Sequence, residues 1–267
     1  MTNWNAFDSW NLVLPPSRPS WDQLKNIHIA IDNIKRDMPV AVLGSTPEFR
    51  DLFRNLGFKN VYIFEKNMEF YTKMKKLMAT DGNNEILIEG DWLDTISQYS
   101  NFFSVILSDL TMGNIPYNYR QDFYKSINNS LDKRGKFIDK ILTHDFFNNV
   151  DCLIYEFSRK PLNIWTANEF NCRMLFCSEL VHKEKMVNTT DIYYYLNKRV
   201  KEKWMQELLK LTKLITPEEG IWYYGKLRNE VEQDYLRCFT VKIINNEPLA
   251  SPYYMYARHY YFEKKEV

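Results

Sequence analysis

Residues 40–65 read VAVLGSTPEFRDLFRNLGFKNVYIFE, and their pattern of apolar residues predicts the fold. The apolar run VAVLGS (40–45) ends beside a glycine, PEFRDLFRNLG (47–57) repeats apolar residues at helical spacing, and VYIFE (61–65) is a second apolar run. Short apolar runs that are separated by a helix are typical of strands buried on both faces of a parallel sheet. The stretch therefore predicts a strand, a helix and a second strand.

The same alternation continues along the chain. Three more apolar runs, EILIEGDW (85–92), FFSVILSDL (102–110) and GKFIDKIL (135–142), are predicted strands. Helices are predicted between them over about 67–79 and 120–132. Five strands that alternate with helices through right-handed crossovers predict an α/β fold with a doubly wound parallel sheet.

The pattern changes after residue 145. Residues 145–235 are predicted to be mainly helical, and KRVKEKWMQELLKLTKLI (198–215) has the clearest amphipathic spacing. FTVKII (239–244) and MYARHYYFEK (255–264) then predict a β-hairpin. Before the sheet, a capping signal predicts a helix over about 21–37.

Composition limits the class of protein. The chain has 267 residues and a formal net charge of +1, so it lacks the surplus of Lys and Arg that general nucleic-acid binding requires. No apolar run approaches the roughly 18 residues of a membrane span, and the first residues lack the pattern of a secretory signal. Four cysteines are too few for a disulfide framework. We therefore expect a soluble, cytoplasmic protein that binds neither nucleic acid nor a membrane.

The residues that follow each strand are candidates for a site, because ligands of open α/β sheets bind at the carboxyl ends of the strands. The first run leads into Gly44, Ser45 and Thr46; Thr46 is a good helix N-cap, and Pro47 suits the first helical position. Free amides at such a turn bind small anions such as a carboxylate. The turn has one glycine only, so the G-x-G-x-x-G loop that approaches the pyrophosphate of NAD or FAD is missing.

Acidic residues end the next three runs. Glu65 is placed to accept hydrogen bonds from two ribose hydroxyls. Asp91 is placed to accept from an adenine amino group while the neighbouring Trp92 stacks on the ring. Asp109 ends the fourth run. One acid at a strand end has an ordinary explanation, because such strands often run into polar loops, but acids at successive ends predict a nucleoside site.

The series VLGSTPE, VYIFE, EGDW and ILSDL resembles motifs I to IV of the class I S-adenosylmethionine-dependent methyltransferases. The C-terminal hairpin resembles the one that closes their seven-stranded sheet. The resemblance implies a Rossmann-like, doubly wound sheet whose last strand is antiparallel. It also implies an N-terminal helical lid (1–38), a methyltransferase domain (39–145 and 236–267) and a helical substrate-specificity insertion between strands five and six (146–235).

The resemblance places the cofactor, S-adenosylmethionine, at the ends of the first four strands. The residues that it implies are Gly44, Ser45 and Thr46 for the methionine part, Glu65 for the ribose, Asp91 and Trp92 for the adenine, and Asp109 and Leu110 for the sulfonium. Thr46 and Pro47 stand where the family usually has glycines. Glu48, early in the following helix, is expected to contact the ammonium group instead.

Methyl transfer to oxygen or to a protonated nitrogen needs a base as well as alignment. His144, just after the fifth strand, and Asp109 are the candidate proton acceptors. The alternatives are a surface or structural role for His144 and cofactor positioning for Asp109. Arg18 and Trp21 are candidates for a lid that excludes water from the cofactor; an exposed loop is the alternative.

Aromatic residues of the insertion are candidates for an acceptor pocket. Residues 193–195 and 222–224 are aromatic and suit a cationic or aromatic ligand, although tyrosines of a helical core would give the same pattern. No metal site is expected, because Cys172, Cys177 and His182 lack an evident fourth ligand.

One further motif resembles a known catalytic box. Asn114-Ile115-Pro116-Tyr117 is similar to the N/D-P-P-Y box of amino-group methyltransferases, but it lies too far beyond Asp109. Pro116 is therefore expected to shape a loop before the next helix.

The sequence thus predicts S-adenosylmethionine-dependent methyl transfer to an O or N atom of a small molecule or short peptide, by a monomer or homodimer. The single glycine and the lack of a secure base leave a second hypothesis: a catalytically silent protein of the same fold that binds the cofactor or a partner. A nicotinamide-dependent oxidoreductase is a third hypothesis, against which the missing glycines count.

Overall fold

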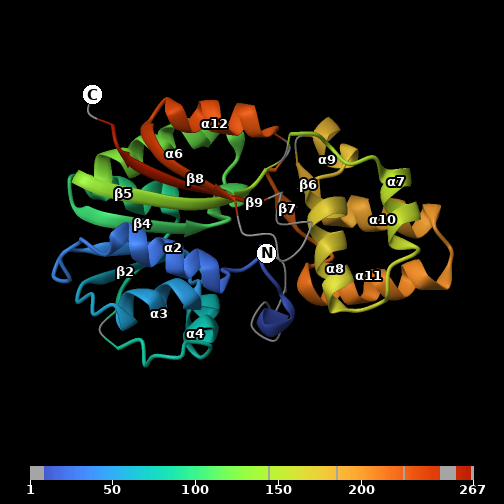
Figure 1. Ribbon diagram of the computed structural model, residues 1–267, viewed down its shortest axis with the longest axis horizontal. Helices are drawn as coiled ribbons and strands as arrows, with labels where there is room; N and C mark the ends of the chain where they lie inside the picture. Colours follow the sequence, from blue (N-terminus) through green and yellow to red (C-terminus); the bar gives the residue numbers. More distant parts are fainter. Residues whose placement is uncertain are drawn as a thin grey trace.

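The computed structural model describes most of the chain and shows a sheet with helices on both faces, followed at one end by a group of helices (Figure 1). The described residues are 9–83, 85–143, 145–184, 186–224, 226–246 and 257–265. Within this part of the chain, no helix is both long and apolar enough to cross a bilayer.

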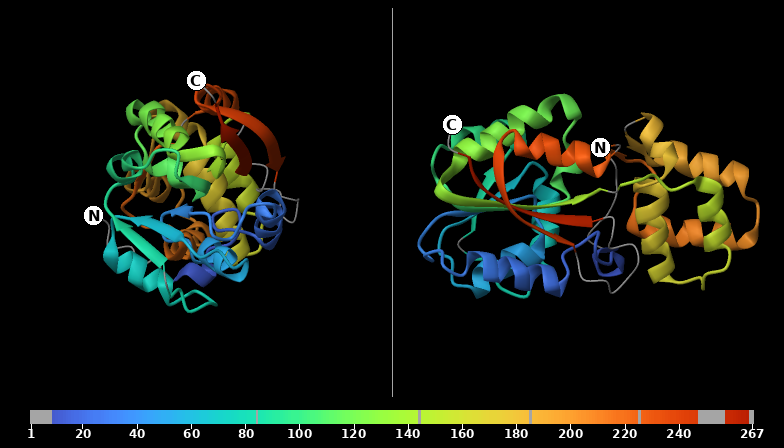
Figure 2. Two further views of the ribbon diagram at one scale, coloured as in Figure 1. Left: turned by 90° about the vertical axis from the view of Figure 1, so that its left-hand side faces the viewer. Right: turned by 45° about the horizontal axis from the view of Figure 1, so that its top comes forward.

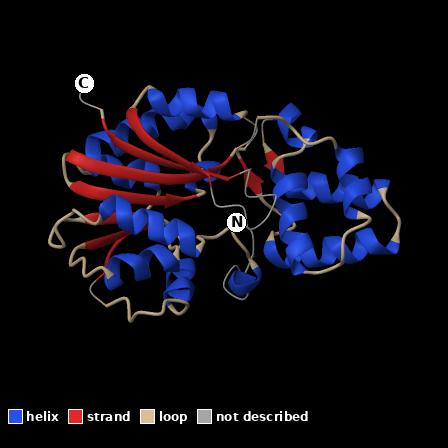
Figure 3. Ribbon diagram, in the orientation of Figure 1, coloured by secondary structure: helices blue, strands red, loops and turns tan. Residues whose placement is uncertain are grey.

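The sheet has seven strands in the order β3-β2-β1-β4-β5-β9-β8 (Figure 3). Strands β1 to β5 are parallel, and β9 runs antiparallel to both of its neighbours, β5 and β8. The bounds are β1 Val40–Leu43, β2 Val61–Glu65, β3 Glu85–Glu89, β4 Phe103–Asp109, β5 Leu131–Leu142, β8 Phe239–Asn246 and β9 Ala257–Lys264. The predicted α/β class, the doubly wound sheet and the antiparallel last strand are confirmed.

Alternation of side chains along β1 divides the core into two layers. Val40 and Val42 belong to the apolar cluster that also holds Phe49 of α3, whereas Ala41 and Leu43 belong to the cluster on the other face. Figures 1 and 2 show α2, α3 and α4 on one face and α6 and α12 on the other. The helices of this part are α2 Trp21–Ile31, α3 Pro47–Asn55, α4 Met68–Lys75, α5 Trp92–Thr95, α6 Tyr117–Ser130 and α12 Arg228–Leu236.

The segment between β5 and α12 is mainly helical, as predicted. Helices α8 and α11 pack on each other, and the short strands β6 and β7 pair as an antiparallel ladder that the sequence did not predict. Its elements are α7 Val150–Phe157, α8 Ile164–Phe170, a π-helix Asn171–Phe176, α9 Glu179–Glu184, β6 Val187–Asn188, α10 Thr189–Arg199, α11 Lys203–Ile215 and β7 Ile221–Trp222.

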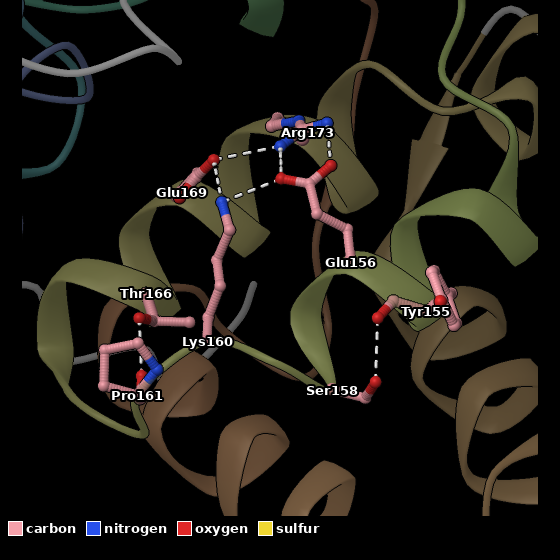
Figure 4. Close-up of polar contacts among 8 residues, drawn as sticks. All are labelled: Tyr155, Glu156, Ser158, Lys160, Pro161, Thr166, Glu169 and Arg173. Carbon is pink, nitrogen blue, oxygen red and sulfur yellow. Dashed lines mark hydrogen bonds and ion pairs between the residues drawn. The ribbon is translucent and has the colours of Figure 1, made fainter.

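Ion pairs tie the π-helix to its neighbours. Figure 4 shows the side chains of Arg173 and Lys160 between the carboxylates of Glu156 and Glu169. Arg173 Nη1 lies 2.6 Å from Glu156 Oε1, and Lys160 Nζ lies 2.6 Å from Glu169 Oε1. The cluster joins α7, α8 and the π-helix, so it fixes the irregular turn by charge as well as by packing.

Several element bounds differ from the sequence-based prediction. Helix α2 ends at Ile31, not near residue 37, and a turn follows. Strand β3 ends at Glu89 because Gly90 has a φ of +146°, a conformation that glycine adopts readily. Strand β5 begins at Leu131, where it pairs with Phe103 across an irregularity in the ladder.

The predicted helix over 198–215 and the predicted C-terminal hairpin have different outcomes. The amphipathic piece 198–215 is divided between α10 and α11, because Val200 has an extended backbone. The C-terminal hairpin forms as predicted between β8 and β9, although its turn lies outside the described residues.

Candidate functional site

The register of the parallel strands brings the predicted residues to one edge of the sheet. Leu43 of β1 pairs with Phe64 of β2 and with Ser108 of β4. The next residue of each strand is Gly44, Glu65 or Asp109. These three residues therefore lie side by side at the carboxyl ends of the strands.

The turn after β1 is built from Gly44, Ser45 and Thr46. Gly44 has a φ of +88°, which a side chain would strain, and its N–H donates to the carbonyl of Phe64. Thr46 occupies the N-cap position of α3 but its side chain makes no capping hydrogen bond. Pro47 is the first helical residue, as predicted. The turn is thus fixed by a backbone hydrogen bond and by proline.

Glu65 is buried and held by two donors. Its Oε2 accepts from the Ser45 hydroxyl at 3.0 Å and its Oε1 from the Asn67 N–H at 3.0 Å. Burial raises the pKa of the Glu65 carboxyl, and these hydrogen bonds oppose that shift. Each carboxylate oxygen has two lone-pair positions, so the group keeps acceptor capacity for a ligand hydroxyl.

Asp91 and Trp92 begin the short helix α5. Asp91 caps the helix through Oδ1, which accepts from the Leu93 N–H, while Oδ2 lies 3.2 Å from Lys66 Nζ. Trp92 Nε1 donates to the carbonyl of Phe64 at 2.8 Å, and a Cβ placed on Gly44 would lie 3.7 Å from the indole. The indole ring of Trp92 is therefore fixed against the turn that follows β1.

Asp109 makes an ion pair that the sequence analysis missed. Its Oδ1 lies 2.7 Å from Nζ of Lys140 on β5, and both side chains are almost fully buried. Lys140 Nζ also donates to Oε1 of Gln23 at 3.2 Å, which links α2 to this carboxylate. A lysine within an apolar strand, at the position beside Asp109, is the signal that could have indicated it.

Leu110 has a left-handed backbone with a φ of +59°. This conformation is uncommon for a residue with a side chain and costs about 1–3 kcal/mol. Two contacts hold it: its N–H donates to the Lys140 carbonyl at 2.9 Å, and its carbonyl accepts from the Tyr224 hydroxyl at 2.9 Å. Strain of this kind is concentrated at functional sites.

The N-terminal segment reaches the site through Glu48. Oε1 of Glu48 accepts from Trp10 Nε1 at 3.0 Å and lies 3.1 Å from Nη2 of Arg18. Oε2 is buried and has no hydrogen-bond partner within the described ranges. Burial raises the pKa of Glu48, and the charge of Arg18 opposes the shift. Trp21 does not join this group, because its side chain is 80% exposed at the start of α2.

The two candidate proton acceptors have different outcomes. His144 lies outside the described residues. Asp109 is described, and its Oδ1 is paired with the Lys140 ammonium. A second acid, Asp139, is buried beside them without having been predicted: it accepts a hydrogen bond from the Tyr235 hydroxyl, and burial raises its pKa to about 7.

The aromatic residues of the insertion divide into two groups. Tyr224 packs on Gly113 and Tyr223 contacts the ring of Tyr117, so both lie beside the loop after β4. Tyr194, by contrast, is 61% exposed on α10, and the Tyr193 hydroxyl donates to the Thr216 carbonyl within the insertion. The structure thus brings residues 223–224, and neither of these two tyrosines, to the loop after β4.

The loop after β4 also shows the role of the N-I-P-Y motif. Asn114 ends a 3-10 turn, and Pro116 is the N-cap residue of α6. Pro116 shapes the start of the helix, as expected.

The charged side chains at this edge have an acidic excess of one. Four carboxylates gather at the strand ends or beside them, and each of three of them is paired with a cation, whereas Glu65 is held by hydrogen bonds. The carboxylates are Glu48, Glu65, Asp91 and Asp109; the cations are Arg18, Lys66 and Lys140. An acidic edge suits a ligand with hydroxyl and cationic groups and opposes a pyrophosphate.

Comparison with known proteins identifies the fold. No family model and no curated protein matches the chain in sequence. A TehB-like methyltransferase from Corynebacterium glutamicum is similar in structure, with a TM-score of 0.53, 10% identity and coverage of 98% of this chain and 97% of that one. The 1,6-didemethyltoxoflavin N1-methyltransferase of Burkholderia thailandensis has a TM-score of 0.56 and 8% identity over 98% and 84%.

One similar structure has a different name. A Rhodobacter sphaeroides protein, provisionally named as a zinc-dependent alcohol dehydrogenase, has a TM-score of 0.57 and 15% identity over the whole of both chains. Likeness at these identities describes the fold and leaves the chemistry to the site. The strand order, the antiparallel β9 and the methyltransferase structures together show that this chain has the Rossmann-like fold of the class I S-adenosylmethionine-dependent methyltransferases.

Proposed function

We propose that the protein is an S-adenosylmethionine-dependent methyltransferase that acts on an O or N atom of a small molecule or short peptide. The observation that carries the proposal is the acidic edge at the carboxyl ends of β1 to β4. Its carboxylates suit ribose hydroxyls, an adenine amino group and an ammonium group, and they disfavour the phosphates of a nicotinamide cofactor.

The described residues fit this cofactor by their chemistry. Glu65 has acceptor capacity for the ribose, and Asp91 presents a half-exposed carboxylate at the next strand end. The buried Oε2 of Glu48, which has no partner in the described part of the chain, suits an ammonium donor. When bound, the cofactor supplies an electrophilic methyl group on a sulfonium.

The chain's own residues would align the acceptor and exclude water. Leu110, with its left-handed backbone, forms the turn nearest the proposed reacting centre. The Tyr224 hydroxyl stabilises this turn by donating to the Leu110 carbonyl. Asp109, paired with Lys140, is proposed to position the cofactor; proton transfer is left to His144 or to an acceptor that needs no base. Within the predicted lid segment (1–38), Trp10 and Arg18 are proposed to cover the cofactor, because both reach Glu48, whereas α2 packs on the sheet.

Calorimetric titration with S-adenosylhomocysteine, with NADH as the control ligand, tests the proposal. We expect a dissociation constant in the micromolar range, about −8 kcal/mol. Glu65→Ala and Asp91→Ala should each weaken binding at least about tenfold, because a hydrogen bond to a charged group is worth about 1.5–3 kcal/mol. Glu69→Ala is the matched control, since this carboxylate is exposed on α4 and pairs with Lys73.

The outcomes separate the hypotheses. Binding of S-adenosylhomocysteine that all three variants retain would move the site away from this edge. Binding of NADH alone would restore the oxidoreductase hypothesis. No binding of either ligand would contradict the proposal and favour a partner-binding role for the fold.

A further inference from the structure

Residues 10–18 form a strap that contacts both the sheet part of the molecule and the insertion. Figures 1 and 2 show its first turn, coloured dark blue, between the sheet and the insertion helices. This turn is the 3-10 helix Trp10–Leu12, and it packs on α11. The strap is therefore placed to connect the cofactor edge with the insertion.

On the sheet side, the strap is held by Glu48. Oε1 of this carboxylate accepts from Trp10 Nε1 at 3.0 Å and lies 3.1 Å from Arg18 Nη2. Arg18 Nη1 also donates to the carbonyl of Trp10 at 3.1 Å, so the two ends of the strap are joined to each other. Both contacts with Glu48 use Oε1, and the buried Oε2 has no hydrogen-bond partner among the described residues.

On the insertion side, the strap is held by the side chain of Asn168 on α8. Its Oδ1 accepts from the Leu14 N–H at 2.8 Å, and its Nδ2 donates to the Leu12 carbonyl at 3.0 Å. Nδ2 also donates to the Ile164 carbonyl at 2.9 Å, within α8 itself. Asn168 is 1% exposed, so its loss would leave buried backbone groups unpaired, which is costly.

The carboxamide of Asn168 fixes the register of the strap as well as its burial. Val13 is 4% exposed and belongs to the same apolar cluster as Phe170 of α8 and Leu208 of α11, so apolar packing alone would hold the strap on the insertion. A carboxamide adds an acceptor and donors in one plane, which match one N–H and one carbonyl of the strap. The match determines which residues of the strap reach Glu48.

An anchored strap also affects the affinity of the site that it covers. The Glu48 side chain is 15% exposed beneath its contacts with the strap, and a polar contact is stronger where water is excluded. A strap that is already ordered does not have to be ordered when a ligand binds, so less free energy is lost on binding. Loss of the anchor should therefore weaken a ligand that binds beside Glu48.

We propose that Asn168 is a positioning residue for the cofactor site, because it anchors the strap to the insertion and thereby keeps Trp10 and Arg18 on Glu48. This inference rests on the proposed function, since it assigns a residue of the insertion to the binding of the same cofactor. It also links the two parts of the molecule: the insertion, which is predicted to select the acceptor, holds the segment that covers the cofactor.

Calorimetry with S-adenosylhomocysteine tests the inference on Asn168→Ala, on Trp10→Ala and on the double variant. Asn168→Ala should weaken binding about fivefold, because the freed strap must be ordered again. The double variant should bind within about twofold of Trp10→Ala, because Asn168 acts through the strap and the two losses do not add. Asn163→Ala is the matched control: Asn163 caps the same helix by accepting from the Thr166 N–H at 3.0 Å, and its loss should leave the affinity unchanged.

Hydrogen exchange followed by mass spectrometry gives a second measurement. Without a ligand, Asn168→Ala should speed exchange in residues 10–18, where the Leu14 N–H loses its acceptor, and Asn163→Ala should not. In the wild-type protein, S-adenosylhomocysteine should slow exchange in the same residues.

The outcomes distinguish this inference from the function beneath it. Unchanged affinity in Asn168→Ala, an equal loss in Asn163→Ala, or losses that add in the double variant would overturn the role of Asn168. If Asn168→Ala fails to fold, exchange in the wild-type protein decides, and exchange in residues 10–18 that the ligand leaves unchanged overturns the inference. Failure of the wild-type protein to bind S-adenosylhomocysteine contradicts the proposed function, whereas binding that does not depend on Asn168 contradicts this inference alone.

Discussion

Arg50 and Arg120 are almost equally buried, on opposite faces of the sheet, and the chain treats them differently. Arg50 faces the carboxylate of Glu85, which also accepts from the Tyr71 hydroxyl at 3.1 Å. Arg120 instead donates to three backbone carbonyls, those of Met112 and Ile115 in the loop after β4 and that of Tyr223 in the insertion. The chain thus gives Arg50 a counter-ion, whereas it uses Arg120 to join two distant segments through neutral acceptors.

Removing the anion from Arg50 should have the largest effect. Glu85→Ala leaves a fully buried guanidinium without a carboxylate, and breaking a buried pair in this way costs about 3–5 kcal/mol. Urea denaturation followed by circular dichroism would measure the change in unfolding free energy.

The double variant Arg50→Met with Glu85→Leu is the control for that experiment. Removing both charges should recover most of the lost stability, because apolar replacements of a buried pair are often neutral. A loss under about 1 kcal/mol for Glu85→Ala would show that Arg50 tolerates isolation as Arg120 does, and the contrast between them would disappear.

The pH dependence of stability should reveal the protonation of Asp139, a buried acid whose pKa is influenced by the charge of Arg120. Burial raises the pKa of Asp139 from 3.8 to about 7, and the charge of Arg120 opposes that shift. The folded state therefore holds a proton that the unfolded state releases, so unfolding free energy falls as pH rises from about 4 to about 7. The decline should be about 2 kcal/mol between pH 5 and 7, and Asp139→Asn should remove it.

Urea titrations at several pH values would measure this decline in both proteins. The Glu69→Ala protein is a suitable control, because Glu69 is exposed and should leave the slope unchanged. A wild-type stability that rises between pH 5 and 7, with no difference in Asp139→Asn, would contradict a protonated Asp139.

The smallest change in stability is expected at the partly exposed ion pair between Arg173 and Glu156. Arg173 and Lys160 lower the pKa of Glu156 to about 2, so the stability that Glu156 contributes is present above about pH 4.5 and is lost as pH falls through 2. The Glu156 side chain is 41% exposed, and solvent screens such pairs, so Glu156→Gln should cost less than about 1 kcal/mol at pH 7.

Urea denaturation of Glu156→Gln in low and in high salt would measure that cost. The difference from wild type should shrink with salt, because screening weakens exposed pairs. A loss above 2 kcal/mol that salt does not change would place this cluster with Arg50 among the buried pairs.

The sheet could be predicted because its signals are local. VYIFE coincides with β2, and the helix predicted over 47–57 corresponds to α3. The hydrophobic period and the turn residues lie within each segment, so a single sequence displays them. The order of strands followed from the resemblance and from the handedness of crossovers.

The contacts that define the site were not predictable in the same way. Lys140 meets Asp109 only through the register of β4 and β5, and Arg120 meets Tyr223 only after the whole insertion has folded. Trp21 was expected over the site because it follows Arg18 closely, yet the helix turns its side chain to solvent. Distant pairings depend on tertiary packing, which no local period records.

The position of β9 has a consequence for biosynthesis. The last described strand lies inside the sheet, between β5 and β8, and does not form its edge. During synthesis, β5 therefore stays unpaired on the side that later binds β9 until the ribosome has made the entire helical insertion. The nascent chain would be most prone to aggregate, and most dependent on chaperones, during that interval.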